Sequence, residues 1–464
     1  MLDELEIHNQ FKESFSRYLD FDPHLRRLKE NPYIFESPLL KENPFHVAGI
    51  YQITGGRQIG KTTFLKQFIK NLLEEKNVKP ENIFFVTGEI IESHDILRRI
   101  VEGFNKKITA HGYIFIDEIS YIKDWDRSIK YLADAGYFED TTVILTGSDS
   151  KIIRTAMKGF AGRRGAADQV DFDFNPLSFM EFVCLIREEL QPLCKDLVEA
   201  PLTDENKKFN IHLGEFNELL HNYLIHGGYL PAINEYYSSS TIPKSVLNTY
   251  VHWIRGDILK HNKNENYLFE IIRGIKTTYN SQVSWNSLSK HLSIEHHKTV
   301  SDYCQILESM HVLHIQEAIL EHKLTGAPKK NRKIYFCDPF IDHALSIYLD
   351  PQLTIETLSA RMSNNEFASS YIEAVCVDHC KRWLPTYYIK GSKGEVDLAL
   401  VFNNTMYPFE VKWSKQLRSI GLKQISTYRN GIVLTPERSG RAMNCMFVPL
   451  ARFLIQVSDR VLII

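Results

Sequence analysis

The chain has 464 residues, of which 44% are hydrophobic and 24% are charged, and its formal net charge is −2. A chain of this length is too long for a single hydrophobic core, so we expect two to four domains. Its seven cysteines are irregularly spaced and no apolar run reaches membrane-spanning length, which argues against a disulfide framework and a membrane protein and indicates the cytoplasm.

The first 45 residues are predicted to be helical, with breaks at four prolines, and to contain no chemistry of their own. We expect them to pack on the domain that follows or on a neighbouring subunit. From 46 to 184, strand-like and helix-like stretches alternate, which predicts an α/β domain built on a parallel sheet. The breaks are at Pro23, Pro32, Pro38 and Pro44.

A phosphate-binding motif stands near the start of this α/β region. Residues 55–63 read GGRQIGKTT and match G-x-x-x-x-G-K-[ST]. An apolar stretch at 46–54 predicts a strand before the motif, and the helical period at 64–73 predicts a helix after it. Backbone N–H groups of such a loop surround phosphate oxygens. The expected nucleotide contacts are Gly55, Gly56, Arg57, Gln58, Ile59, Gly60, Lys61, Thr62 and Thr63.

Polar side chains at two later strand ends complete the predicted ATP site. Lys61 is expected to reach the β- and γ-phosphates, and Thr62 to ligate Mg²⁺. The apolar stretch 112–118 ends in Asp117, which we expect to help hold Mg²⁺, and Glu118, which we expect to polarise the attacking water. The stretch 141–150 supplies Thr146 and Ser148, either as a γ-phosphate sensor or as ordinary turn residues.

A glycine-rich loop follows at 159–165, with the sequence GFAGRRG. Its Arg163, or the adjacent Arg164, is predicted to be an arginine finger that stabilises transition-state charge in its own or a neighbouring subunit. The alternative is a solvated basic loop.

These motifs, together with NPLSFMEFV at 175–183 and GGYLP at 227–231, resemble one lineage of AAA+ ATPases found in archaea and bacteria. Members of that lineage often have a C-terminal domain with a nuclease-like pattern. The resemblance implies ATP hydrolysis with Mg²⁺, a helical lid over 185–260 and a ring-like homo-oligomer, with a hexamer as one expected size. This sequence has Gly55–Gly56 where the lineage has glycine–proline, and its element of Gly227, Gly228 and Pro231 is one residue longer.

Residues 261–352 are predicted to form a winged helix-turn-helix. Short helices around 288–292 and over 297–310 precede strands at 312–319 and 333–337, which flank the basic loop APKKNRK at 327–333. We weigh DNA contact evenly against a role as a spacer between proteins. The expected nucleic-acid contacts are Lys298, Lys329, Lys330, Arg332 and Lys333 in this segment, and Lys390 and Lys393 further on.

The C-terminal segment, 353–464, has 14 Lys and Arg against 9 Asp and Glu, an excess of basic residues that favours a polyanionic partner. Asp397, Glu410 and Lys412 follow the D-x(n)-E-x-K pattern and resemble the restriction-endonuclease-like fold. Together with Glu373 from a preceding helix, Asp397 and Glu410 are expected to bind one or two Mg²⁺, while Lys412 positions a water. A domain that binds DNA or protein without cutting is the equally weighted alternative.

The complete prediction is a P-loop AAA+ α/β domain with a helical lid, a winged helix-turn-helix, and a C-terminal PD-(D/E)XK nuclease-like α/β domain. The predicted function is a Mg²⁺-dependent ATPase that couples ATP binding and hydrolysis to DNA binding, including branched or forked DNA. Two alternatives stay open: an ATP-dependent DNA endonuclease, and a nucleotide-switched regulator of protein assembly that does not use DNA.

Overall fold

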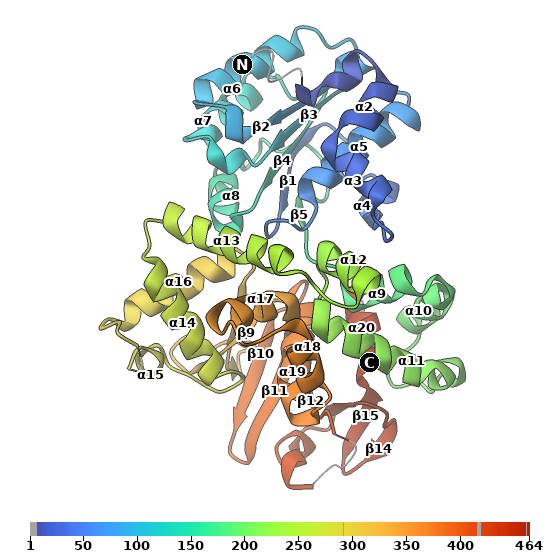
Figure 1. The fold of residues 1–464 in the computed structure, drawn as a ribbon, viewed down its shortest axis with the longest axis vertical. Helices are drawn as coiled ribbons and strands as arrows, with labels where there is room; N and C mark the ends of the chain where they lie inside the picture. Colours follow the sequence, from blue (N-terminus) through green and yellow to red (C-terminus); the bar gives the residue numbers. More distant parts are fainter. Residues whose placement is uncertain (1–6, 291, 415–418, 461) are drawn as a thin grey trace. The chain divides into compact units, whose positions relative to one another are not determined.

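A parallel sheet is the centre of the first of two units, Met1–Asn175 and Pro176–Ile464 (Figure 1). The computed structural model describes residues 7–290, 292–414, 419–460 and 462–464. The sheet has the strand order β2-β3-β4-β1-β5, and its neighbouring strands are paired in parallel. The strands are β1 (Gly49–Thr54), β2 (Ile83–Thr87), β3 (Gly112–Asp117), β4 (Thr141–Gly147) and β5 (Asp171–Asp173).

Helices cover both faces of this sheet, which explains why β1, β3 and β4 are buried along their whole length. One face packs its apolar side chains against α6, α7 and α8, and the other against α2, α3 and α5. This is the α/β fold with a parallel sheet that the alternating pattern predicts. The helices are α2 (Phe15–Phe21), α3 (Pro23–Glu30), α4 (Pro38–Glu42), α5 (Lys61–Glu74), α6 (His94–Asn105), α7 (Trp125–Asp134) and α8 (Ser150–Met157).

The N-terminal segment packs on the sheet domain of its own chain. Asn9 lies beside the edge strand β2, where its side chain donates to Phe85 O at 2.8 Å and accepts from Phe85 N at 2.9 Å. Asp22, the N-cap of α3, forms a buried ion pair with Lys66 of α5 at 3.3 Å. The segment therefore covers an exposed sheet edge and belongs to the first unit.

The second unit begins with helices and contains twelve α-helices among the residues described by the structure. Four of them, α10 to α13, lie within 185–260, the region that the sequence predicts to be a lid, whereas α9 begins before it. They are α9 (Phe179–Ile186), α10 (Gln191–Glu199), α11 (Lys207–His226), α12 (Leu230–Ser239), α13 (Lys244–Lys260), α14 (Glu265–Thr277), α15 (Trp285–Ser289), α16 (His297–Ser309), α17 (Pro339–Leu349), α18 (Ile355–Met362), α19 (Asn365–Lys381) and α20 (Leu450–Ser458).

Two short antiparallel strand pairs follow α14, α15 and α16. In the longer pair, β6 and β9, Leu313 lies opposite Phe336 and Glu317 opposite Arg332. The predicted helix over 297–310 is thus α16, and the predicted strands at 312–319 and 333–337 correspond to β6, β7 and β9. The strands are β6 (Leu313–Glu317), β7 (Ile319–Leu320), β8 (Thr325–Gly326) and β9 (Arg332–Phe336).

A six-stranded mixed sheet, in the order β10-β11-β12-β13-β15-β14, forms the C-terminal part. Its first three strands are antiparallel neighbours, and β12, β13 and β15 then run parallel. The helix α19 precedes the sheet in sequence and α20 follows it (Figure 1). The strands are β10 (Thr386–Gly391), β11 (Gly394–Phe402), β12 (Thr405–Val411), β13 (Ile432–Thr435), β14 (Gly440–Ala442) and β15 (Cys445–Pro449).

Within the described ranges, no helix has both the length and the apolar character needed to cross a lipid bilayer. The five-segment division of the chain, including the winged-helix and nuclease-like assignments, stays a prediction at this point.

Candidate functional site

The phosphate-binding motif forms a tight connection between β1 and α5. The chain leaves β1 at Thr54 and enters α5 at Lys61. Gly60 has φ 97°, a left-handed conformation that side chains disfavour. A Cβ atom on Gly55 would lie 2.1 Å from Phe174 O, so only glycine fits there. The loop therefore ends at a helix N-terminus, where free backbone N–H groups favour an anion.

Lys61 lies buried under this loop. Its Nζ donates to Gly55 O at 2.9 Å and to Gly56 O at 2.7 Å, and it lies 3.6 Å from Glu118 Oε1. Burial lowers the pKa of Lys61, while the carboxylates of Glu118 and Asp117 oppose that shift. Neutral carbonyl groups thus hold the ammonium next to the loop. Phosphate oxygens can replace them, and because these oxygens are charged they bind the ammonium more strongly.

Asp117, at the end of β3, accepts hydrogen bonds from two hydroxyl groups. Thr62 Oγ1 donates to its Oδ2 at 2.7 Å, and Thr146 Oγ1 donates to its Oδ1 at 2.5 Å. Thr146 Oγ1 also accepts from the backbone N–H of Glu118 at 3.0 Å. Hydroxyl and carboxylate oxygens are ligands that suit Mg²⁺, so Thr62 and Asp117 fit the predicted ion. Thr146 supports both acidic residues from β4.

Glu118 has a left-handed backbone, with φ 48° and ψ 48°, directly after the strand. Its Oε2 accepts from Ser148 N and from Ser148 Oγ, both at 3.2 Å, and its Oε1 faces Lys61. Ser148 therefore positions the carboxylate that sequence reasoning assigned to water activation. A hydroxyl at the end of the next parallel strand was the only sequence signal for this contact.

The two arginines of the glycine-rich loop have different surroundings. Arg164 donates to Ile50 O at 3.2 Å and to Val170 O at 2.8 Å, and it pairs with Asp171, so it connects β1 to β5. Arg163 is exposed, and its guanidinium pairs with Asp134 at 2.5 Å. That hydrogen bond raises the pKa of Arg163. Arg163 is the one of the two whose charge can leave its present partner without opening the sheet.

Other contacts around the motif were not foreseen from the sequence. The Arg57 guanidinium donates to Tyr121 Oη at 2.8 Å, and Thr63 Oγ1 lies 3.2 Å from His24 Nδ1. Asp173 accepts from Thr54 Oγ1 and from Arg154, each at 2.6 Å. Arg154 lies on α8, far from the motif in sequence, so only the fold brings it beside the start of the loop.

The second constellation lies in the C-terminal part. Asp397 is on β11, Glu410 is near the end of the neighbouring strand β12, and Lys412 directly follows that strand. Asp397 Oδ2 accepts from Val411 N at 2.9 Å, and Lys412 pairs with Glu410 Oε1. Burial, together with the charge of Asp397, raises the pKa of Glu410 to about 8. Glu410 Oε2 is buried and has no hydrogen-bond partner in the part of the chain that the structure describes.

Glu373, on α19, contacts a lysine that the sequence assigned elsewhere. Lys333 Nζ lies 2.7 Å from Glu373 Oε1, and Tyr335 Oη donates to the same oxygen at 2.6 Å. Burial, with the charge of Asp397, raises the pKa of Glu373. Within residues 7–290, 292–414, 419–460 and 462–464, no group of three His, Cys, Asp or Glu is arranged to hold a metal ion.

The predicted nucleic-acid contacts divide into exposed and buried residues. Arg332 and Lys333 are 8% and 1% exposed, so these two do not present their charges to solvent as expected. The reason is strand register: β9 directs Lys333 toward Glu373, and Arg332 lies over the Trp285 ring at 4.4 Å from its centroid. The exposed ones are Lys298, Lys329, Lys330, Lys390 and Lys393.

Comparison with known proteins bears on the region that contains the first site. Residues 48–183 match a family model described as an AAA domain, and residues 217–352 match a domain of unknown function, DUF8612. With the P-loop, the Thr62–Asp117 contact and the parallel sheet, the first match identifies an ATPase domain of the AAA+ kind in this chain.

A curated relative, the uncharacterized protein MJ1544 of Methanocaldococcus jannaschii, is 26% identical over 175 residues. The match covers 36% of this chain and spans about a third, 35%, of that relative's length.

Solved structures give weaker likenesses. The Walker-type ATPase paby2304 of Pyrococcus abyssi is 14% identical with a TM-score of 0.44, covering 71% of this chain and all of that one. The Aeropyrum pernix ORC1 protein in complex with DNA is 12% identical with a TM-score of 0.30, covering 76% and 94%. The Thermotoga maritima RuvB Holliday junction branch migration motor is 14% identical with a TM-score of 0.28, covering 64% and 87%. Likenesses of this size establish neither the fold nor the partners of this chain.

Proposed function

We propose that this protein is a Mg²⁺-dependent ATPase whose nucleotide cycle is coupled to DNA binding by the second unit. The observation that carries the proposal is the convergence of Lys61, Thr62 and Asp117 at the carboxyl ends of neighbouring strands, beside a glycine loop and a helix N-terminus. ATP with Mg²⁺ supplies a γ-phosphoryl group that water can attack.

Each side chain has a role set by its contacts. Lys61 exchanges the carbonyls of Gly55 and Gly56 for phosphate oxygens, and Thr62 with Asp117 holds the cation. Glu118, kept in place by Ser148, accepts a proton from water or orients it. Thr146 keeps Asp117 and Glu118 in register and is a positioning residue.

For the DNA-binding part, support comes from the order of elements and from exposed charge. Helices α15 and α16 followed by β6 and β9 match the order of a winged helix, with Lys329 and Lys330 on the connecting loop. Tyr388 Oη donates to Asn331 O at 2.7 Å, so this loop lies against β10, near Lys390. Exposed lysines on adjoining elements suit a phosphate backbone.

A nuclease-like C-terminal domain is proposed on the same grounds. The helix α19 is followed by the antiparallel strands β10, β11 and β12 and then by the parallel strands β13 and β15, which make an α/β domain. Asp397 and Glu410 lie on neighbouring strands, as the D-x(n)-E-x-K pattern requires. We propose that this domain holds DNA and that active subunits assemble as a homo-oligomer in which Arg163 completes a neighbour's ATP site.

DNA binding is tested by the salt dependence of affinity. The full chain is titrated against labelled duplex, forked and four-way DNA by fluorescence anisotropy at several salt concentrations. A double Lys329→Glu, Lys330→Glu variant should bind more weakly to every DNA, with the slope of log affinity against log salt reduced by about 2. The matched control is Lys207→Glu with Lys208→Glu, another adjacent exposed pair, on α11.

Two results would decide against the proposal. Equal loss in the control pair would mean that net charge, rather than this loop, governs binding. Absence of binding by the wild-type chain at low salt, where phosphate contacts are strongest, would favour the nucleotide-switched regulator of protein assembly instead.

A further inference from the structure

The side chain of Lys333 lies among three carboxylates of the proposed nuclease-like domain. Its Nζ is 2.7 Å from Glu373 Oε1, forms an ion pair with Glu395 Oε1, and is 3.7 Å from Asp397 Oδ1. Burial by itself would lower the pKa of Lys333, but the charges of Glu373, Asp397 and Glu395 raise it above the ordinary value. The ammonium group of Lys333, 1% exposed, is therefore held inside the domain by ion pairs with carboxylates.

The remaining oxygens of these carboxylates are also engaged. Glu373 accepts from Tyr335 Oη at 2.6 Å and, through its other oxygen, from Asn280 Nδ2 at 2.8 Å. Glu395 Oε2 accepts from Gln282. These donors come from the segment 280–283 and from β9, which form a bridge between Val283 and Arg332. Asn280 and Gln282 thus donate hydrogen bonds to Glu373 and Glu395, which water bound to a metal ion would otherwise donate.

The charge balance explains why a cation must be present. Carboxylates this close together repel each other, and burying them without a counterion is strongly unfavourable. In metal sites, a bound divalent ion neutralises such a group of carboxylates. Here Lys333 meets it for Glu373, Glu395 and Asp397. Meanwhile Lys412 is paired with Glu410, whose buried Oε2 has no hydrogen-bond partner among the described residues. The carboxylates as arranged do not fit a metal ion, and the lysine is the reason.

We propose that Lys333 is a built-in cation that excludes divalent metal ions from the centre formed by Glu373, Asp397 and Glu410. The inference rests on the proposed nuclease-like domain, because it treats these carboxylates as a metal centre in latent form. While Lys333 lies there, the domain binds nucleic acid without cutting it.

The test is direct measurement of Mn²⁺ binding to the full chain without nucleotide, by electron paramagnetic resonance of the free ion. Lys333→Met keeps the length of the side chain and removes its charge. It should bind one Mn²⁺ more per chain than the wild type, and a further Asp397→Asn change should abolish that extra site. The control is Lys330→Met, an exposed lysine on the same connection, which should match the wild type.

Folding of Lys333→Met is followed by its Tm with and without Mn²⁺, because the variant leaves three carboxylates without their counterion. We expect a lower Tm that Mn²⁺ restores, and no Mn²⁺ effect on the wild type. If the variant does not fold, Lys333→Met combined with Glu395→Gln, which has one negative charge fewer, is titrated in its place.

The two ways of failing are distinguishable. A wild-type Mn²⁺ site that Asp397→Asn removes would overturn the exclusion by Lys333 while leaving the nuclease-like proposal intact. A folded Lys333→Met chain that binds no additional Mn²⁺ would overturn the latent metal centre, because the carboxylates would then have no affinity for metal even when free; DNA holding by this domain is decided separately by the salt titration. Neither result depends on the ATPase, which serves as a check that the first unit is folded.

Discussion

At the scale of single residues, the ATP site depends on Asp117 and Glu118 being next to each other but doing different work. Asp117 accepts from the hydroxyls of Thr62 and Thr146, whereas Glu118 leaves the strand in a left-handed turn and is held by Ser148 and Lys61. The turn after β3 therefore gives the two neighbours different positions, with Asp117 placed to hold the cation and Glu118 placed to act on water. Substitutions of the two charged residues, Lys61 and Glu118, should separate binding from turnover.

Lys61→Ala is expected to abolish ATP hydrolysis and to weaken nucleotide binding, since it removes the cation that faces the phosphates. Glu118→Gln should retain ATP while stopping turnover, because the amide still accepts from Ser148 but does not take a proton. Binding of a fluorescent ATP analogue and phosphate release are measured on both variants. Hydrolysis by Glu118→Gln at the wild-type rate would remove Glu118 from the mechanism.

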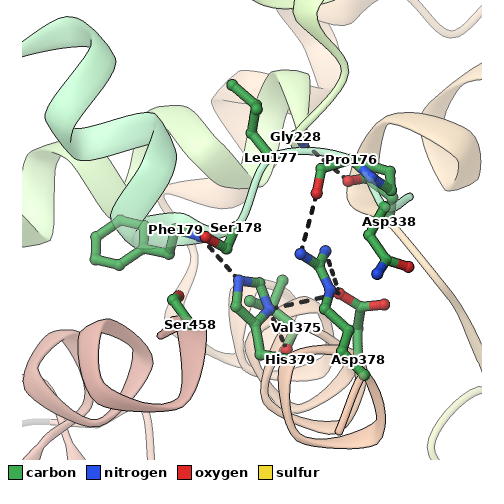
Figure 2. A network of polar contacts seen from close by, with 12 residues as sticks. Pro176, Leu177, Ser178, Phe179, Gly228, Asp338, Val375, Asp378, His379 and Ser458 are labelled. Atoms are coloured by element: carbon green, nitrogen blue, oxygen red, sulfur yellow. Dashed lines mark hydrogen bonds and ion pairs between the residues drawn. The ribbon is translucent and has the colours of Figure 1, made fainter. Parts of the chain in front are cut away.

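At the scale of elements, a buried network joins the start of the second unit to α19, the helix that holds Glu373. Figure 2 shows the main chain of 176–179 lying beside His379 and Asp378. Arg382 donates to Pro176 O at 3.0 Å and pairs with Asp378 at 2.7 Å, and His379 Nε2 accepts from Phe179 N at 2.9 Å. The segment that continues from the ATPase domain is thus anchored on the helix of the proposed nuclease-like centre.

The paired glycines of GGYLP have a packing role in this network. A Cβ atom on Gly228 would lie 2.1 Å from Leu177 O, and Gly228 N donates to Asp338 Oδ2 at 2.8 Å. Gly228→Ala should therefore lower the Tm by several degrees, on the order of 1–3 kcal/mol. Gly214→Ala is the control, because that helical glycine has open space around it and alanine should stabilise by about 0.5–1 kcal/mol. Equal Tm changes for both would argue against the close approach.

The same network predicts a pH dependence. Burial, with the charge of Arg382 nearby, lowers the pKa of His379 to about 3. Its Nδ1 donates to Val375 O at 2.8 Å and its Nε2 accepts, so the folded state requires the neutral ring. The unfolded chain binds the proton first, so stability present above about pH 6.5 is lost as the pH falls toward 3.

The measurement is the Tm of the wild type and of His379→Gln at about pH 7.5 and about pH 5. The glutamine carbonyl keeps an acceptor for Phe179 N and does not titrate. Acidification should therefore lower the Tm of the variant less than that of the wild type. Burial raises the pKa of Asp338 to about 7, so the stability of the folded state that depends on its neutral form is lost as the pH rises. Both proteins contain Asp338, so this opposite effect is the same in each. Parallel changes in the two proteins would contradict the assignment.

At the scale of the whole molecule, the two arginines of the glycine-rich loop bear on whether one chain contains a complete ATP site. Arg163 is exposed and its partner Asp134 is on α7, whereas Arg164 is tied to β1 and β5. An exposed arginine in a glycine-rich loop suits a finger that acts on a second copy of the chain.

If Arg163 acts in a neighbouring subunit, turnover per chain should rise with protein concentration, and Arg163→Ala should cost about 10³-fold in rate with little change in Tm. Mixing Arg163→Ala with Lys61→Ala chains should restore part of the ATPase activity, since each supplies what the other lacks. Arg164→Ala is the contrasting variant and should lower the Tm. Turnover independent of concentration, with no restoration on mixing, would leave each chain as its own ATPase.

The local patterns of the chain were enough to predict the ATP-binding domain. A glycine loop between a strand and a helix, and an apolar strand ending in Asp117–Glu118, specify their geometry over a few consecutive residues, because strand and helix periods place the side chains directly. The parallel sheet followed from the alternation of elements. The E-x-K spacing likewise predicted that Glu410 and Lys412 lie close together, although β12 ends at Val411, one residue before Lys412.

Partners distant in sequence were decided only by the tertiary structure. Ser148 on Glu118, Arg154 on Asp173 and Gly228 against Leu177 depend on how elements pack, which no local spacing specifies. Lys333 is the clearest case. In the sequence it ends a basic loop and reads as a solvent-exposed contact for phosphate. In the fold, its place in β9 directs the ammonium inward, where the attraction of three partly buried carboxylates outweighs its tendency to remain in water.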